Sequence, residues 1–398
     1  MQTNIVKKYY GEDSTEHIYY DLRLDNLYKD SENSKIASIN TKVSNILDKQ
    51  SDYEMAVTFW NLRGYLPVFI CPILEGSNTN INATPYGVCY RYAGVDYATR
   101  VIYSPDANTG VYPDPKPPGG INGNGGIQDI SSGYYFIFTF EKFIEMVNTA
   151  LLASYIAFNT ANPGVHGQAV YFQYDAETGL ISLVAEYSYR DGGGGAEIYM
   201  NALLLNYFEG IRVIFYGYDQ TNFKDFRFPM VYNYTTNSKA HFLIGQTPIV
   251  TIAPAIPPNP PYMIFEQEYD CRYLWANIKS IIFTSSTISV REEFLPNVKN
   301  PNATTLSSTF NSAFNPSSKS IISYYDIIFN TTSTSGANWR QYLYYIPQVQ
   351  KWMDLTSNDA LNQFNIEVFI QLTNGQTLPL YIPVNSSIDI KLLFRKKN

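Results

Sequence analysis

Histidine, cysteine and charged residues are scarce in this chain of 398 residues, which contains 3 histidines and 3 cysteines. Asp, Glu, Lys and Arg together make up 16% of the residues, against roughly 25% in an average globular protein. This low charge excludes a coiled coil, long solvated helices and disorder driven by charge. No apolar run approaches the ~18 residues of a membrane span, and the start of the chain lacks the features of a secretory signal. We therefore expect a soluble protein that is made in a reducing compartment.

The scarcity of histidine and cysteine also argues against catalysis. The three histidines are isolated in separate parts of the chain, and they are His17, His166 and His241. The three cysteines show neither metal-ligand spacing nor an even number for a disulfide framework, and they are Cys71, Cys89 and Cys271. The glycine run Gly192–Gly195 lacks the Lys-Ser/Thr pair of a phosphate-binding loop. We therefore expect no enzymatic activity, no catalytic residue and no cofactor.

One set of carboxylates is a candidate cation site. Glu266, Glu268 and Asp270 alternate along the sequence, so a strand would place all three on one face. A row of carboxylates suits a hard cation such as calcium or magnesium. The favoured interpretation is a solvated strand face without a metal, with Phe265 and Gln267 pointing to the opposite side.

The balance of charge also limits the choice of partners. The net charge is −7, and the chain has no stripe of Lys and Arg, so a dedicated nucleic-acid-binding domain is excluded. The basic cluster at the C-terminal end consists of Arg395, Lys396 and Lys397. We interpret it as a solvated tail, and the alternative is a weak contact with nucleic acid or anionic lipid.

Short apolar or alternating runs, separated by turn residues, recur along the whole chain. Examples are Tyr53–Trp60, Ile278–Phe283, Phe364–Leu372 and Ile388–Phe394. The 35 tyrosines fit this pattern, because tyrosine favours strands and protein interfaces. Many short strands with such punctuation indicate an all-β sandwich or barrel.

Three segments break this rhythm with a helical period. In Thr139–Phe158 the apolar residues recur at spacings of three and four, and Thr139 is a suitable N-cap. Met200–Phe208 is a shorter candidate, and Asn338–Leu355 is a third, although Pro347 interrupts it.

Two segments rich in proline or glycine enclose the first two helices. They are Ser104–Gly133 and Ile252–Tyr262, and neither can extend a sheet or a helix. We therefore expect an insertion between two sets of strands. The expected organisation is an N-terminal arm at 1–17, a discontinuous β domain at 18–103 and 262–394, and an inserted α+β domain at 104–261 with a helix at about 139–158.

Five stretches, in this order, resemble minor capsid (penton-like) proteins of polinton-like viruses and virophages. They are Asp52–Ile73, Phe138–Tyr155, Asp175–Glu186, Tyr273–Glu293 and Phe364–Lys397. The resemblance implies a jelly-roll β-sandwich of the viral capsid type with an inserted domain. It also implies a structural virion protein, made in the host cytoplasm, that forms pentamers at five-fold vertices among major capsid proteins.

Two alternatives stay open at this point. Within capsids, the alternative is a short double jelly-roll major capsid protein. In a different class of function, the tyrosine content suits a β-sandwich carbohydrate-binding or adhesive module. The absence of a signal peptide and of a disulfide framework argues against that module.

Overall fold

The computed structural model of this chain consists mostly of antiparallel strands. It describes residues 5–9, 17–26, 35–36, 38–63, 66–72, 82–104, 135–189, 195–213, 226–230, 240–243, 262–275, 277–290, 320–326, 342–346, 350–373, 375, 377–382 and 386–397. The expected loop at 104–133 therefore lies almost entirely outside the described residues, as does most of the proline-rich segment at 252–262.

Strands from both ends of the chain form the first sheet, in the order β1-β2-β23-β5-β18, with β19 also paired to β5. The strands are β1 (Ile5–Tyr9), β2 (His17–Asn26), β5 (Tyr53–Arg63), β18 (Tyr342–Tyr345), β19 (Met353–Asp354) and β23 (Ser386–Lys396). The last strand lies between two early ones, since Ile390 is opposite Leu22 on one side and Trp60 on the other. The described part of the expected arm is thus an edge strand paired with β2.

The second sheet has the order β17-β16-β20-β21, and β4 also pairs with β20. Its strands are β4 (Ser38–Leu47), β16 (Ile278–Ser285), β17 (Ser320–Asp326), β20 (Leu361–Leu372) and β21 (Thr377–Pro379). The strands β3 (Lys35–Ile36) and β22 (Tyr381–Ile382) form a separate two-stranded ladder, and the 3-10 helix η1 (Gln50–Asp52) precedes β5. The two sheets have the strand orders of a jelly roll, which are β2-β23-β5-β18 in the first sheet and β4-β20-β16-β17 in the second. Apart from β16 and β17, consecutive strands of these orders alternate between the two sheets, as the crossings of a jelly roll require.

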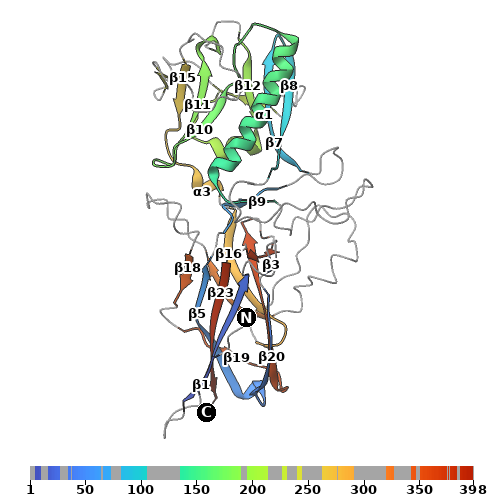
Figure 1. The fold of residues 1–398 in the computed structure, drawn as a ribbon, viewed down its shortest axis with the longest axis vertical. Helices are drawn as coiled ribbons and strands as arrows, with labels where there is room; N and C mark the ends of the chain where they lie inside the picture. Colours follow the sequence, from blue (N-terminus) through green and yellow to red (C-terminus); the bar gives the residue numbers. More distant parts are fainter. Residues whose placement is uncertain are drawn as a thin grey trace, which may run out of the picture.

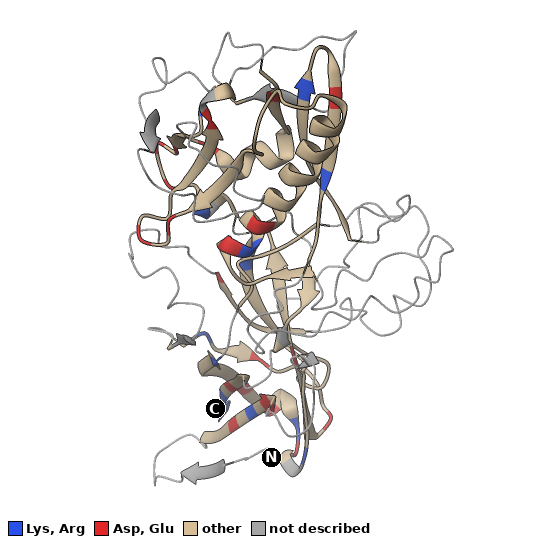
Figure 2. Ribbon diagram, turned by 45° about the horizontal axis from the view of Figure 1, so that its top comes forward, with Lys and Arg blue, Asp and Glu red and all other residues tan. Residues whose placement is uncertain are grey.

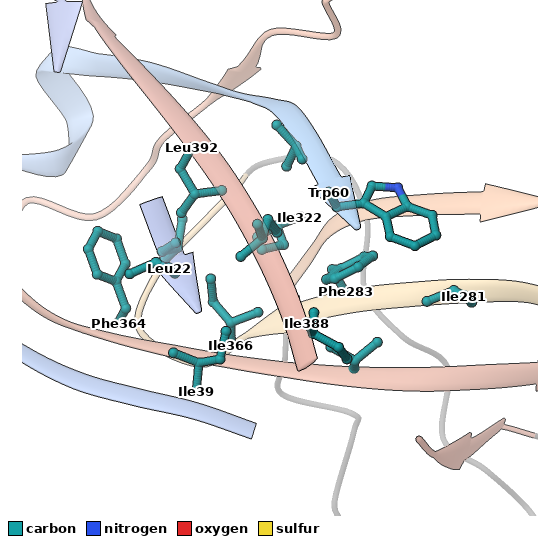
Figure 3. Packing of buried hydrophobic residues seen from close by; sticks show 14 of the residues in the cluster. Leu22, Ile39, Trp60, Ile281, Phe283, Ile322, Phe364, Ile366, Ile388 and Leu392 are labelled. Atoms are coloured by element: carbon teal, nitrogen blue, oxygen red, sulfur yellow. The ribbon is translucent and has the colours of Figure 1, made fainter. Parts of the chain in front are cut away.

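The two sheets enclose one hydrophobic core (Figure 3). Leu22 and Trp60 from the first sheet contact a common cluster with Phe283 and Ile366 from the second. Period-two alternation places the apolar residues inward along most strands. On β23 the register shifts between Lys391 and Leu392, so three consecutive residues at 392–394 are all buried.

The central part of the chain builds a second core around a long helix (Figure 1). Helix α1 (Phe140–Ala161) begins at Thr139, whose hydroxyl accepts a hydrogen bond of 3.1 Å from the Lys142 amide. One sheet has the order β13-β12-β7-β8 and another β10-β11-β15-β14. Their strands are β7 (Ala83–Tyr92), β8 (Val95–Ile102), β10 (Tyr171–Tyr174), β11 (Ile181–Glu186), β12 (Glu197–Asn201), β13 (Phe226–Pro229), β14 (Ala240–Leu243) and β15 (Tyr262–Glu266). The short helices are η3 (Tyr187–Tyr189), α2 (Ala202–Leu205), η4 (Asn206–Phe208) and α3 (Arg272–Trp275).

A two-stranded ladder separates the two cores. It consists of β6 (Phe69–Ile70) and β9 (Phe136–Ile137), whose alternating side chains enter different cores. Ile70 and Phe136 belong to the jelly-roll core, whereas Phe69 and Ile137 pack near α1. Asn277 closes this junction, because its amide accepts from the Ile70 nitrogen at 3.1 Å and donates to the Ile70 oxygen at 2.9 Å.

The all-β jelly-roll prediction is confirmed, and α1 occupies the segment expected to be helical. Within the described residues the second core does not repeat the jelly-roll strand order, so the double jelly roll is not the fold seen here. The Asn338–Leu355 helix prediction is wrong, because β18 and β19 lie in that segment. A helical spacing of apolar residues over so short a stretch also fits two strands joined by a turn.

The sheets divide the chain at different residues from those expected. Strands β7, β8 and β15 fall within the expected jelly-roll ranges, but they pair with strands around α1 and contribute to the second core. Helix α1 packs against β7 and β8, and strand periodicity alone does not identify the sheet that a strand joins. We propose that the jelly-roll unit comprises 17–66 and 277–397, and that the intervening segment is the insertion.

Replacing Ile390 by alanine tests whether β23 seals the jelly-roll core. Ile390 is completely buried, so Ile390→Ala should lower the free energy of unfolding by about 2–5 kcal/mol. Its neighbour Lys391 points to the opposite, solvent side, and Lys391→Ala should cost less than about 1 kcal/mol. Urea denaturation followed by tryptophan fluorescence measures both. Equal losses from the two variants would show that β23 does not pack as described.

Candidate functional site

The three candidate carboxylates do not share one strand face. Strand β15 ends at Glu266, and Glu268 and Asp270 lie in the irregular segment that follows. Glu268 is exposed, and Asp270 is bound to Arg272. Within the described residues, no group of three His, Cys, Asp or Glu side chains gathers as a metal site would require. The premise of a continuous strand was wrong.

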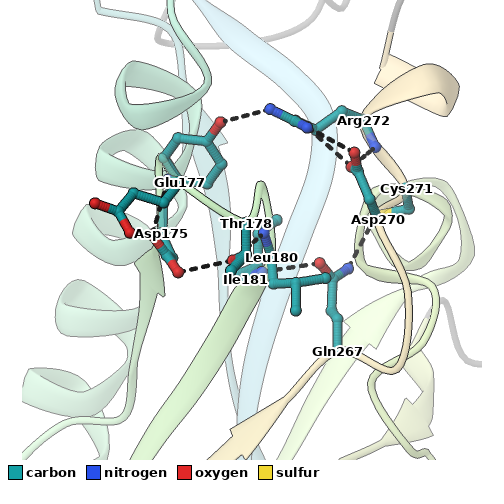
Figure 4. A network of polar contacts seen from close by, with 10 residues as sticks. Asp175, Glu177, Thr178, Leu180, Ile181, Gln267, Asp270, Cys271 and Arg272 are labelled. Atoms are coloured by element: carbon teal, nitrogen blue, oxygen red, sulfur yellow. Dashed lines mark hydrogen bonds and ion pairs between the residues drawn. The ribbon is translucent and has the colours of Figure 1, made fainter. Parts of the chain in front are cut away.

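Asp270 and Arg272 instead form a latch against the β10–β11 turn (Figure 4). The Asp270 carboxylate accepts from the Arg272 Nε at 2.9 Å and lies 2.7 Å from its Nη2. The same guanidinium donates to the Tyr174 hydroxyl at 3.3 Å. The turn comes so close that a Cβ atom on Gly179 would lie 2.2 Å from the Arg272 Cζ. These contacts hold the start of α3 against the second core.

Gln267 extends the pairing of β15 with β11 by one residue, because its backbone nitrogen donates to the Ile181 oxygen at 3.0 Å. Its side chain is completely buried; the amide oxygen accepts from the Ile181 nitrogen at 2.9 Å, and its nitrogen donates to the Glu209 oxygen at 2.8 Å. The alternation along the sequence predicts only that Gln267 lies on the face opposite the carboxylates. The one feature of the sequence that indicates a structural role is a polar residue at a position expected to be apolar.

The basic C-terminal cluster lies at the end of β23, with Lys397 just beyond the strand, and is largely neutralised. The Arg395 guanidinium donates to the Glu54 carboxylate at 2.7 Å and stacks over Trp352 at 4.1 Å. The Lys397 ammonium lies 2.9 Å from the Asp354 carboxylate. Of the three residues, Lys396 alone has no ion pair among the described contacts, so the cluster does not form a free positive patch.

A buried polar network surrounds His166 in the second core. Its ring is stacked on Tyr189 with centroids 3.7 Å apart, and its Nε2 accepts from the Ala196 nitrogen at 2.8 Å. The other ring nitrogen lies 2.9 Å from the Ser188 hydroxyl, which donates to Glu186 at 3.1 Å. Burial lowers the pKa of His166 to about 4. A neutral imidazole that accepts from a backbone amide acts as a structural crosslink.

The cysteines and the remaining histidines add no catalytic arrangement in the described residues. All three cysteines are buried free thiols, and burial raises the pKa of Cys71 well above its ordinary value. A buried neutral thiol is a poor nucleophile. His17 lies on β2 and His241 on β14, in different sheets. Helix α1, the longest described helix, is not apolar enough to cross a membrane, and neither is any other described helix.

A pair of glycine substitutions tests the latch. Gly179 and Gly164 both have positive φ, at +73° and +82°, so alanine costs about 1–2 kcal/mol of backbone strain at either position. No atom lies within 4 Å of a Cβ built on Gly164, whereas Gly179→Ala must also displace Arg272. Chemical denaturation should therefore show a further loss of about 1 kcal/mol for Gly179→Ala, because a displaced Arg272 loses its ion pair with Asp270. Similar losses in the two variants would contradict the latch.

The His166 network predicts a specific acid sensitivity. The pKa of His166 is about 4 in the folded chain and about 6.5 in the unfolded chain. Between pH 4 and pH 6.5, therefore, the imidazole is protonated in the unfolded chain but not in the folded chain. This contribution to stability is fully present above about pH 6.5 and is lost as the pH falls toward 4. Urea unfolding across this range should show a flatter pH dependence for His166→Gln than for the unsubstituted chain. Parallel curves would contradict the prediction.

Comparison with known proteins identifies relatives among virophage capsid proteins. A family model described as Sputnik minor capsid protein V18/19 matches residues 18–396. Structural protein V19 of Sputnik virophage is 29% identical over 136 residues, which are 33% of this chain and 56% of that protein. The aligned part therefore spans little more than half of that curated relative.

Solved structures share the fold over almost the whole chain. A chain in the cryo-EM structure of Sputnik virophage aligns with a TM-score of 0.68 and 23% identity, covering 96% of this chain and 98% of that one. The mavirus penton protein aligns with a TM-score of 0.56 and 13% identity, covering 96% and 99%. The resemblance drawn from the five sequence stretches is confirmed. Since the family model extends from residue 18 to residue 396, this chain belongs to the Sputnik minor capsid protein V18/19 family.

Proposed function

We propose that this minor capsid protein forms pentamers that occupy the five-fold vertices of an icosahedral capsid. Its family makes it a structural component of the virion. The observation that carries the vertex role is a single jelly roll of order β2-β23-β5-β18 and β4-β20-β16-β17, extended by an inserted unit. The mavirus penton protein, a similar structure by fold, supports the same role.

The two-unit architecture suits a vertex protein physically. Strand β23 pairs with both β2 and β5, so early and late parts of the chain form one sheet. A unit of this kind can be repeated around a symmetry axis. The chain leaves the jelly roll through β6 and returns to it at Asn277, which is hydrogen-bonded to Ile70 of β6, so the inserted unit projects from one end of the sandwich (Figure 1). In this role the jelly-roll unit contacts other copies and the surrounding major capsid protein, and the inserted unit faces away from the shell.

The proposed role is structural and requires no catalytic step. The absence of clustered ligands in the described residues and the low reactivity of the buried thiols are consistent with it. A contact between the C-terminal basic cluster and nucleic acid would need the ion pairs of Arg395 and Lys397 to open. We therefore propose packing against capsid neighbours rather than genome binding.

Native mass spectrometry of the purified full chain tests the vertex proposal. A complex of five copies is expected, because a five-fold vertex is occupied by five equivalent subunits. A trimer would instead indicate a major-capsid-type assembly, and a stable monomer at all concentrations would contradict self-assembly. Mixing with the major capsid protein of the same virus provides the second readout, and a stoichiometric complex is expected.

A further inference from the structure

Strand β8 is a terminal strand of the sheet β13-β12-β7-β8 and lies at the outside of the inserted unit, beside α1 (Figure 1). Its residues Ala98 and Arg100 are exposed, and so is Val95, with 52% of its surface accessible. Proteins usually blunt such an edge with a proline, a lysine or a short strand. The opposite terminal strand, β13, has four residues and ends at Pro229. Strand β8 has eight residues and contains neither proline nor lysine, so its edge is suited to pairing with a further strand.

The register of the β7–β8 hairpin shows which peptide groups point to that open edge. Tyr97 on β8 is paired with Tyr90 on β7. The Ser154 hydroxyl bridges this pair, because it accepts from the Tyr90 nitrogen at 3.2 Å and donates to the Tyr97 oxygen, so the peptide groups of Tyr97 face β7. Since peptide groups alternate in direction along a strand, those of Ala98 and Arg100 face the open edge. Within the described residues, neither has a backbone partner on that side.

The charges along this edge are complementary to those of an identical strand. Tyr97 packs its ring on Phe158 of α1, with the centroids 5.8 Å apart. The alternate residues Asp96, Ala98 and Arg100 therefore share the face that points away from the helix. Figure 2 shows one acidic and one basic position on β8, with uncharged residues between them. An antiparallel copy of the strand, centred on Ala98, would place each Asp96 opposite Arg100 of the partner subunit.

From this pattern we infer that β8 pairs with β8 of a second copy of this chain, antiparallel and about a two-fold axis at Ala98. The contact joins two sheets into one continuous sheet and forms two ion pairs between Asp96 and Arg100. Asp96 also receives the Arg91 guanidinium, with Nη2 at 2.8 Å, but its side chain is 29% exposed and a carboxylate has room for further donors. Registers centred on Asp96 or on Arg100 would bring like charges together, so the charges favour this register.

The inferred contact differs in symmetry from the contacts of a vertex. A two-fold contact uses the same surface on both copies, whereas neighbours around a five-fold axis meet through two different surfaces. The β8 contact therefore joins inserted units that belong to different five-fold rings. It goes beyond the vertex function and does not depend on it.

Disulfide trapping on the full chain tests the pairing. In the inferred register the two copies of Ala98 lie opposite each other, so Ala98→Cys should give a disulfide-linked dimer under mild oxidation, with a 98–98 link in mass spectrometry. Val95→Cys is the matched control, because it exposes a thiol on the same strand at roughly 20 Å from its equivalent and should stay unlinked. The three native cysteines are buried and do not compete.

A charge exchange tests the register independently. Added to Ala98→Cys, Arg100→Asp opposes like charges and should slow disulfide formation about tenfold, since two surface ion pairs are lost. Asp96→Arg, added in the same way, should also slow it. A mixture of these two double variants restores opposite charges at both contacts, so disulfide-linked heterodimers should form at close to the original rate.

Other outcomes overturn the inference. An unlinked Ala98→Cys removes it, and equal linking of Ala98→Cys and Val95→Cys shows only random collision. A mixture that links no faster than either double variant alone contradicts the pairing of Asp96 with Arg100. Hydrogen exchange that slows at 96–100 only after addition of the major capsid protein shows that a strand of that protein fills the edge. Pentamers of Arg100→Asp in native mass spectrometry keep the vertex proposal separate, because this change leaves the jelly roll intact.

Discussion

The position of β23 between β2 and β5 is the constraint on which the structure depends. This strand pairs along almost its whole length with both neighbours, and they come from the first 63 residues of the chain. Its inward residues Ile388, Ile390 and Phe394 are at most 1% exposed. The sheet therefore cannot close until β23 is in place, while the central part of the chain has a separate core around α1. High sequence separation of this kind makes a jelly roll slow to fold and cooperative once formed.

Side-chain amides satisfy backbone groups next to strands at three places in the described residues. Asn148 on α1 accepts from the Phe172 nitrogen and donates to the Phe172 oxygen, at 2.7 Å and 2.8 Å. Asn277 does the same for Ile70 at the junction, and just beyond β15 the side-chain oxygen of Gln267 accepts from the Ile181 nitrogen. Each amide satisfies buried backbone groups without introducing a charge. This use of amides is one physical reason why a chain with so few charged residues can link helices, strands and two separate cores.

The sequence predicts local structure well, whereas it does not determine which partners each element takes. Period-two runs and the helix after Thr139 follow from spacing, and the order of five stretches was sufficient to indicate the family. Strands β7 and β15 pair with strands of the second core and not with the jelly roll, so the expected boundaries at 103 and 262 differ from the division between the sheets. Asp270 was expected beside two other carboxylates, but Arg272, two residues later, binds it instead.

Native-state hydrogen exchange at increasing denaturant tests most directly whether the two ends of the chain form one cooperative unit. Amides of β2, β5 and β23 should share one opening free energy, because they belong to one sheet and one core. Amides of α1 and β7 should follow a second, separate opening. The account would be contradicted if β2 and β5 opened together with β7 and α1 while β23 remained protected, since the chain would then consist of sequential domains.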